Sequence, residues 1–253
     1  MSNKDSIKID ILYEDPHCVV INKPAGIMVH SDGRSGGPFL TDWVEEKYPE
    51  AKDVGESISA PDGSKINRAG IVHRLDRETS GALIIAKTAE AHAHLKKQFQ
   101  DRTITKKYLA FVWGEMEEEF GTITRPIGRS SQDFRKWSAQ RGARGETRDA
   151  ETYWTRLFTT KTAAGQKFTL LEAEPKTGRT HQIRVHFVAL QHPIVGDRLY
   201  APKRPMALGF DRAALHSRSV EFVTVEGKTI KIIAPLPDDF QVAYKELGVT
   251  YKE

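Results

Sequence analysis

Short stretches in which apolar residues alternate with polar ones, or follow one another without a break, predict that this chain is rich in β-strands. Residues 7–13 alternate, whereas the unbroken apolar run at 82–86 is typical of a strand buried on both faces. Further strands are expected at 18–22, 106–113, 152–158, 167–174, 215–225 and 228–233. Turns containing Gly165 and Gly227 predict that the last four of these strands form two hairpins.

Helical periodicity is confined to a few segments. Ala91, Leu95 and Phe99 recur every four residues, and Thr88 precedes them as an N-cap, so a helix is expected at 89–100. Shorter helices are expected at 40–48, from the cap Thr180 to about residue 190, and within 235–247. The pattern predicts an α+β protein whose single domain, residues 1–253, has two lobes on either side of a basic segment at 125–150.

Composition narrows the class of protein. The 253 residues include one cysteine, which excludes an intramolecular disulfide and fits a reducing compartment. The N-terminal residues lack a signal-peptide core, and no segment approaches the roughly 18 apolar residues of a membrane helix. We therefore expect a soluble, cytoplasmic protein that is not associated with a membrane. The net charge of +4 is mild, so the distribution of charge says more than its sum.

The basic segment combines cations with aromatic residues. Its cations are Arg125, Arg129, Arg135, Lys136, Arg141, Arg144 and Arg148. Phe134 and Trp137 are interleaved with them. One interpretation is a mobile, solvated loop. We favour a flexible arm that binds phosphates and offers rings for base stacking, with Arg129, Arg135 and Lys136 as candidate RNA contacts.

The sequence HRLDRETSG at 73–81 lies between the apolar runs 69–72 and 82–86, so Asp76 is expected on a loop beside a buried strand. The guanidinium groups of Arg74 and Arg77 favour the ionised carboxylate and can orient it. Such a carboxylate could act as a nucleophile or a general base. The alternative is a structural ion pair on a loop.

The segment EPKTGRTHQIRVHF at 174–187 places a basic face at the start of a predicted helix. His181 and Arg184 lie on this face, which is a natural anion site, and Arg179 and His181 are candidate RNA contacts. His181 and His186 are five residues apart, with no acidic ligand at a matching position, and we therefore predict no metal site.

These motifs, together with NKPAG at 22–26 and KKYLAFVWG at 106–114, resemble the RluA family of pseudouridine synthases. HPIVGD at 192–197 and the segment at 215–217 match as well, and the resemblance extends from about residue 9 to about residue 240. It implies the pseudouridine synthase fold: a mixed, largely antiparallel sheet in two lobes with flanking helices and an active-site cleft between them. It also implies the form that lacks the N-terminal RNA-binding domain.

The resemblance implies roles at the matching positions. Asp76 would be the catalytic aspartate, and Arg74 would enter the RNA stack as the target uridine flips out. Tyr108 would stack on the uracil, and Arg184 would pair with Asp76. The pocket would be lined by Leu171 and Ile183. The substrate would be rRNA or tRNA. The sequence leaves the oligomeric state open, and a monomer is our default expectation. Because the isomerisation is redox-neutral and uses no outside group, no cofactor is expected.

Two other classes of protein remain as alternatives. A nucleosidase-type hydrolase would need a second carboxylate beside Asp76, for which Glu78 is the neighbour in sequence. A non-catalytic RNA-binding module would keep the basic segment and be indifferent to Asp76. Within the synthase interpretation, the carboxylate either attacks the anomeric carbon or deprotonates the ribose, and the sequence leaves both routes open.

Overall fold

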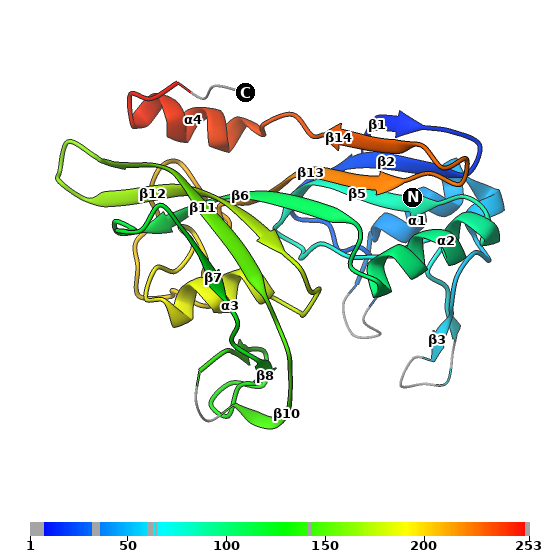
Figure 1. Cartoon of the computed structure of the whole chain (residues 1–253), viewed down its shortest axis with the longest axis horizontal. Helices are drawn as coiled ribbons and strands as arrows, with labels where there is room; N and C mark the ends of the chain where they lie inside the picture. Colours follow the sequence, from blue (N-terminus) through cyan, green and yellow to red (C-terminus); the bar gives the residue numbers. More distant parts are fainter. Residues whose placement is uncertain (1–7, 32–35, 60–62, 64, 141–142, 251–253) are drawn as a thin grey trace. The chain divides into compact units, whose positions relative to one another are not determined.

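The computed structural model describes residues 8–31, 36–59, 63, 65–140 and 143–250 (Figure 1). The chain divides into two compact units. The first comprises the residues up to 105 together with 219–235, and the second comprises 106–218 together with the residues from 236 onward. Strand β13 (Leu215–Val223) crosses from the second unit to the first. No helix in the described ranges has the length and apolar character needed to cross a membrane.

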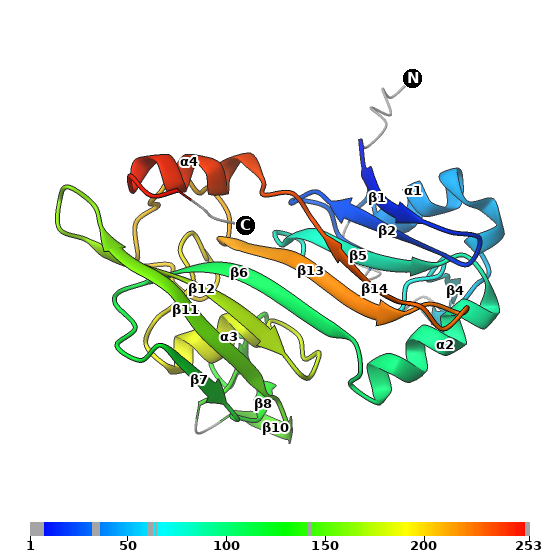
Figure 2. The same cartoon turned by 45° about the horizontal axis from the view of Figure 1, so that its top comes forward.

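In the first unit, β2 (Cys18–Lys23) pairs antiparallel with β1 (Asp10–Glu14) on one side and with β5 (Ser80–Ala86) on the other, as Figure 2 shows. All seven residues of β5 are buried, as the unbroken apolar run predicts. Helix α2 (Ala89–Gln100) packs against β5. The unit also contains α1 (Leu40–Lys47), the 3₁₀ turn η1 (Pro49–Ala51), β3 (Ile58–Ser59), β4 (Lys65–Ile66) and β14 (Thr229–Ile233), which pairs with the end of β13.

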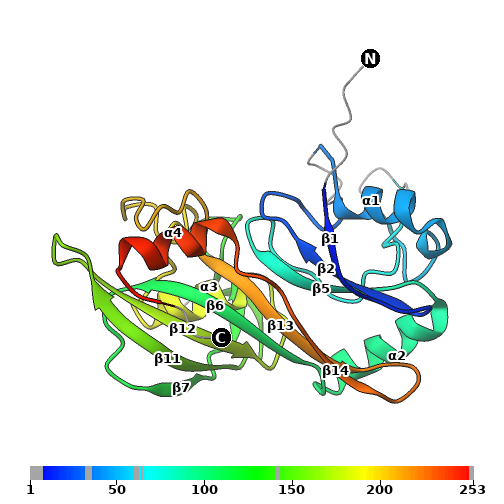
Figure 3. The same cartoon turned by 90° about the horizontal axis from the view of Figure 1, so that it is seen from above.

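In the second unit, four antiparallel strands follow the order β6-β12-β11-β7. Their bounds are β6 (Thr105–Trp113), β7 (Phe120–Ile123), β11 (Thr152–Lys161) and β12 (Lys167–Pro175). Helices α3 (Gln182–Ala189) and α4 (Asp238–Glu246) cover opposite faces of this sheet (Figures 1 and 3). Phe240 of α4 packs on Phe111 of β6, and Phe187 of α3 packs on Trp154 of β11.

The basic segment is built as a second small sheet in the order β10-β8-β9. Its strands are β8 (Ile127–Arg129), β9 (Trp137–Ser138) and β10 (Arg144–Arg148). Where we expected a flexible arm, these residues form short strands. The segment is too polar to form a core alone, but Ile127, Ala139 and Ala150 complete one with Val185 of α3. The arm therefore lies within the second unit, whereas we expected it to separate two lobes.

Most of the predicted elements are confirmed, including both hairpins. Helix α2 has the predicted bounds, and the Thr88 hydroxyl accepts a hydrogen bond from the amide of Ala91 at 3.2 Å. The predicted cap Thr180 is wrong, because His181 is the N-cap of α3 and has a left-handed backbone with φ of +56°. The buried Gln182 side chain accepts from the amide of Arg179 at 3.0 Å, which ties the first turn of α3 to the residues that precede it.

Gly70 provides a stability test of the segment that leads into the Asp76 loop. Its φ is +74°, and a Cβ atom there would lie 1.9 Å from the carbonyl oxygen of Ala86. Gly70→Ala should therefore lower the free energy of unfolding by about 2–5 kcal/mol through backbone strain and overpacking together. Gly165→Ala is the control, because φ is +80° but the space is open, and it should cost only about 1–2 kcal/mol. Equal losses in urea unfolding would contradict the clash.

Candidate functional site

The Asp76 carboxylate is presented at a turn in the first unit, between the bridge residue Ile71 and β5. The side chain of Asp76 is half-buried, and the amide of Thr79 closes the turn by donating to the Asp76 carbonyl at 3.1 Å. Leu75 and Thr79 are buried on either side of the turn. Buried neighbours therefore hold a partly accessible carboxylate on a short, anchored loop.

His73 fixes the start of this loop rather than presenting a reactive imidazole. Its Nε2 accepts a hydrogen bond from the backbone amide of Ile84 in β5 at 2.9 Å, and its ring stacks on Phe99 of α2 with centroids 4.8 Å apart. Because a backbone amide can only donate, Nε2 is unprotonated in this arrangement. His73 is therefore a structural residue that ties the loop to a strand and a helix.

Lys23 joins the loop to the NKPAG turn and was not singled out by the sequence analysis. Its side chain is fully buried, and Nζ donates to the carbonyl oxygens of Pro24 at 2.8 Å, Ile27 at 2.8 Å and Arg77 at 3.2 Å. The Gly26 amide also donates to the Arg77 carbonyl at 2.8 Å. The available signal was a lysine in the same strand as four consecutive apolar residues and separated from them only by Asn22, because burial of such a group requires partners.

The two arginines that flank Asp76 have different surroundings. Arg77 is exposed, but its Nε donates to the carbonyl of Gly26 at 3.0 Å. Arg74 is also exposed, and its side chain has no hydrogen bond or ion pair with any residue that the structure describes. The loop ion pair that the sequence offered as an alternative is therefore not formed by Arg74.

Tyr108, Leu171 and Ile183 belong to the second unit. Tyr108 of β6 lies opposite Ala173 of β12, and Ala110 lies opposite Leu171. Since alternate residues share a face and opposed residues point the same way, Tyr108 and Leu171 are diagonal neighbours on one face of the sheet. Tyr108, Leu171 and Ile183 are all buried.

Lys106 adds a buried cation to that face of β6, two residues before Tyr108. Burial lowers the pKa of Lys106 to about 8, and the nearby ammonium of Lys176 contributes in the same direction, while Glu174 opposes them. Tyr108 therefore shares its face of the strand with an ammonium that titrates well below the usual range of lysine.

Arg184 of α3 forms a buried, bidentate ion pair with Asp197. Its Nε lies 2.7 Å from Oδ2 and its Nη2 lies 2.8 Å from Oδ1 of Asp197. The guanidinium carbon also lies 4.9 Å from the ring centroid of Tyr200. Asp197 is part of the HPIVGD motif but was not among the predicted site residues. The expected pairing of Arg184 with Asp76 joins residues of different units and stays a prediction.

The other polar residues around α3 have internal partners. Arg179 Nε donates to the Asp149 carbonyl at 3.0 Å, and His181 Nδ1 lies 2.7 Å from the Tyr200 hydroxyl. His186 is fully buried, with Nδ1 2.9 Å from the Thr152 hydroxyl and Nε2 3.0 Å from the Arg125 carbonyl oxygen. Burial lowers the pKa of His186. Across the described ranges, His, Cys, Asp and Glu side chains form no group of three that could hold a metal ion.

The candidate RNA contacts of the arm differ in their surroundings. The Arg129 guanidinium lies 4.2 Å from the Trp137 ring, whereas Arg135 forms two hydrogen bonds with Asp133 at 3.0 and 2.8 Å. These bonds lower the pKa of Asp133 to about 2. The Phe134 side chain is 80% exposed, and so it is accessible for stacking. Arg141, another cation of the segment, lies outside the described residues.

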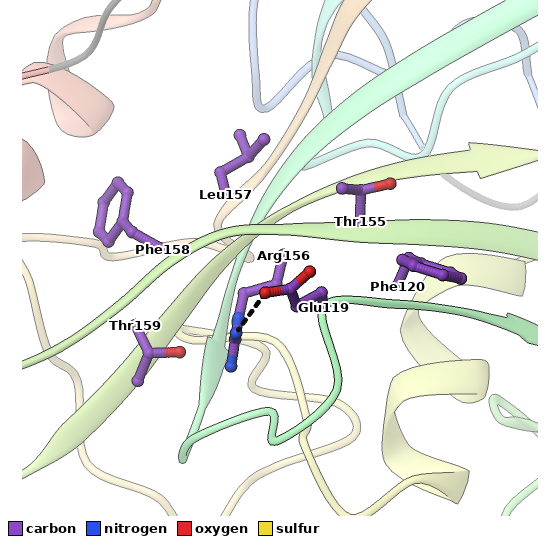
Figure 4. Close-up of a pocket in the computed structure, with 7 residues that line it drawn as sticks. All are labelled: Glu119, Phe120, Thr155, Arg156, Leu157, Phe158 and Thr159. Carbon is purple, nitrogen blue, oxygen red and sulfur yellow. Dashed lines mark ion pairs between the residues drawn. The ribbon is translucent and has the colours of Figure 1, made fainter.

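A separate open pocket of about 590 Å³ lies along β11 (Figure 4). Arg156 lines it, donating to the carbonyls of Met116 at 2.8 Å and Glu117 at 3.0 Å, with Glu119 at 3.9 Å. None of the predicted site residues lines this pocket. Because Arg156 already donates hydrogen bonds to the turn before β7, we keep the Asp76 loop, and not this pocket, as the candidate site.

The family model described as RNA pseudouridylate synthase matches residues 17–189, which include the Asp76 loop, Tyr108, Leu171 and α3. The chain belongs to this family. It is an RNA pseudouridine synthase, an isomerase that acts on RNA, and the resemblance seen in the sequence is confirmed.

Curated relatives of this pseudouridine synthase share about a third of its residues. A ribosomal large subunit pseudouridine synthase D of Xanthomonas campestris is 38% identical, covering 93% of this chain and 68% of the relative. The protein of the same name from Zymomonas mobilis is 34% identical, covering 96% of this chain and 74% of the relative. An uncharacterised RNA pseudouridine synthase of Synechocystis is 35% identical, covering 93% and 68%.

Solved structures agree with the fold of a pseudouridine synthase. Human RNA pseudouridylate synthase domain containing 1 has a TM-score of 0.70 and 27% identity, covering 94% of this chain and 87% of its own. Human RNA pseudouridylate synthase domain containing 4 has the same TM-score at 23% identity and supports the fold alone. The predicted α+β fold with a largely antiparallel sheet is therefore confirmed.

Lys23 gives a test of how the Asp76 loop is held. Lys23→Met keeps the apolar length but leaves the carbonyls of Pro24, Ile27 and Arg77 without this donor. We expect the free energy of unfolding to fall by about 2–4 kcal/mol. Amide exchange at Gly26, which donates to the Arg77 carbonyl, should accelerate relative to the wild type. Lys87→Met, which removes a partly exposed ammonium elsewhere in the unit, is the control, and an equal loss there would contradict a special role of Lys23.

Proposed function

We propose that this synthase converts a uridine of rRNA or tRNA to pseudouridine, with Asp76 as the catalytic carboxylate. The anchored turn that presents a half-buried Asp76 carries the proposal. Among the two RNA classes we favour large-subunit rRNA, because relatives at 34–38% identity bear that substrate in their names. We further propose that the enzyme acts as a monomer in the cytoplasm.

The reaction requires two main features of the protein, a correctly positioned carboxylate and a pocket that holds the base. The bond between the anomeric carbon and N1 of uracil breaks, the base turns, and the anomeric carbon bonds to C5. The proton on C5 is lost, and N1 gains one, so atoms and electrons balance without an outside group. Asp76 serves either route, because attack on the anomeric carbon and deprotonation of the ribose both require an ionised carboxylate.

The neighbouring residues take their proposed roles from the family resemblance. Arg74, exposed and without a partner among the described residues, enters the RNA stack as the uridine leaves it. Tyr108 stacks on the uracil, and Leu171 and Ile183 supply apolar pocket surface. Arg184 orients the catalytic carboxylate. Its pairing with Asp197 supports this role, because two parallel hydrogen bonds along one edge of the guanidinium fix its plane and therefore the direction of its remaining N–H groups.

The proposal predicts that Asp76→Asn abolishes turnover, because the amide can neither attack nor accept a proton, while RNA affinity stays within about twofold of the wild type. Release of tritium from C5 of labelled uridine measures the reaction, with transcripts of large-subunit rRNA and of tRNA as separate substrates. Glu78→Gln is the matched control, two residues away in the same loop, and should retain wild-type release.

Four outcomes would contradict the proposal. Free uracil among the products, or loss of turnover in Glu78→Gln as well as in Asp76→Asn, would indicate a hydrolase with paired carboxylates. Tritium release from Asp76→Asn equal to that of the wild type would exclude this aspartate as the catalytic group. Binding of both RNAs by the wild type without release would indicate a non-catalytic RNA-binding module.

The arm predicts a change in the salt dependence of RNA binding. Replacing Arg129, Arg135 and Lys136 by alanine removes phosphate-binding cations, so affinity should fall and the slope of log Kd against log salt should drop by about one per lost contact. Filter binding from about 50 to 200 mM salt measures the slope. A control variant with equal charge change replaces Lys161, Lys228 and Lys231, which are exposed lysines outside the arm. The same slope change in both variants would show that the arm has no special contact with phosphate.

A further inference from the structure

Tyr200 lies where the arm, the N-terminus of α3 and Arg184 meet. Its ring packs against the small core that joins the arm to α3, which contains Ile127, Ala139, Ala150 and Val185. The arm is therefore not an independent loop, since its apolar side is completed by the helix that carries Ile183 and Arg184.

The Tyr200 hydroxyl connects two backbone elements. The amide of Trp137 in β9 donates to it at 3.0 Å, and it lies 2.7 Å from Nδ1 of His181. Because the amide can only donate, the hydroxyl oxygen accepts there, and the same hydroxyl forms a second hydrogen bond with the His181 imidazole. His181 is the N-cap of α3 and holds a left-handed backbone, so this bond fixes the residue directly before the helix.

The same tyrosine also supports Arg184. Its ring faces the Arg184 guanidinium, with 4.9 Å between the guanidinium carbon and the ring centroid. Its backbone amide donates at 3.0 Å to Oδ1 of Asp197, the oxygen that accepts from Nη2 of Arg184. A shift of Tyr200 would therefore displace Arg184 in two ways, through the Tyr200 ring and through Asp197, the carboxylate that pairs with Arg184.

On the arm, Trp137 links Tyr200 to Arg129, one of the RNA contacts in the proposed function. Trp137, whose amide holds the hydroxyl, carries the Arg129 guanidinium over its ring at 4.2 Å. Arg129 is in register with Arg144 of β10, and both side chains are exposed. Phosphate bound by these cations would therefore act on the strand that holds the Tyr200 hydroxyl.

We propose that Tyr200 is a positioning residue that couples RNA contact at the arm to the placement of Arg184. The inference rests on the proposed function, in which Arg184 orients the catalytic carboxylate. RNA bound along β8 and β10 fixes β9, and the Trp137 amide then holds the Tyr200 hydroxyl, which holds the start of α3. The pathway consists of contiguous contacts within one unit.

Tyr200→Phe tests the coupling, because it removes the hydroxyl and keeps the ring beside Arg184. Single-turnover tritium release is measured at saturating RNA, on the large-subunit rRNA or tRNA transcript from which the wild type releases tritium. We expect the rate to fall about tenfold, with Kd within about twofold of the wild type. Tyr153→Phe, which removes the hydroxyl of another tyrosine in the same unit, is the control and should leave both quantities unchanged.

A double-mutant cycle with Arg144→Ala separates coupling from a purely structural role. Alone, Arg144→Ala should lower the saturating rate about three- to tenfold, but in the Tyr200→Phe background it should lower the rate no further. Rate losses that multiply, or a wild-type rate in Tyr200→Phe, would overturn the coupling and leave the proposed function standing. A wild type that releases no tritium from either RNA would overturn both.

Discussion

The position of the Asp76 loop depends on the hydrogen bonds that the buried ammonium of Lys23 donates. An isolated charge taken out of water is costly, and it persists only where hydrogen-bonding groups replace the solvent. Here three backbone carbonyls do so, from Pro24, Ile27 and Arg77, and they belong to two turns far apart in sequence. The hydrogen bonds of the ammonium therefore hold the two turns close together. Apolar packing alone would fix their separation less strictly, because it tolerates small shifts.

A second buried charge pair organises the other unit in the same way. Arg184 and Asp197 are both nearly inaccessible to solvent, and their two parallel hydrogen bonds fix the guanidinium plane. Asp197 is itself held by the amides of Leu199 and Tyr200 at 3.1 and 3.0 Å. Removing either partner would leave an uncompensated buried charge. The ion pair that orients the Arg184 guanidinium therefore also contributes to the stability of the unit.

The sequence predicted the elements whose signals are local, and it missed those whose partners are distant. The apolar run at 82–86 and the cap at Thr88 were sufficient for β5 and α2. The strands of the arm could not be predicted, because their core is completed by Val185 of α3. At the candidate site, the motifs led to the prediction of Asp76 and Arg184, whereas the fixed position of Lys23 depends on carbonyls that no local pattern reveals.

The arm shows why polarity alone is a poor guide to order. Short strands with exposed arginines would not fold in isolation, since they bury too little apolar surface to offset their conformational entropy. Packed on α3 and tied by the Trp137 amide to Tyr200, the same segment presents Arg129 from β8 and Phe134 from the turn between β8 and β9. Order at the arm would reduce the entropy lost on binding if RNA contacts these residues, as we propose, and such contacts could then contribute to rate as well as affinity.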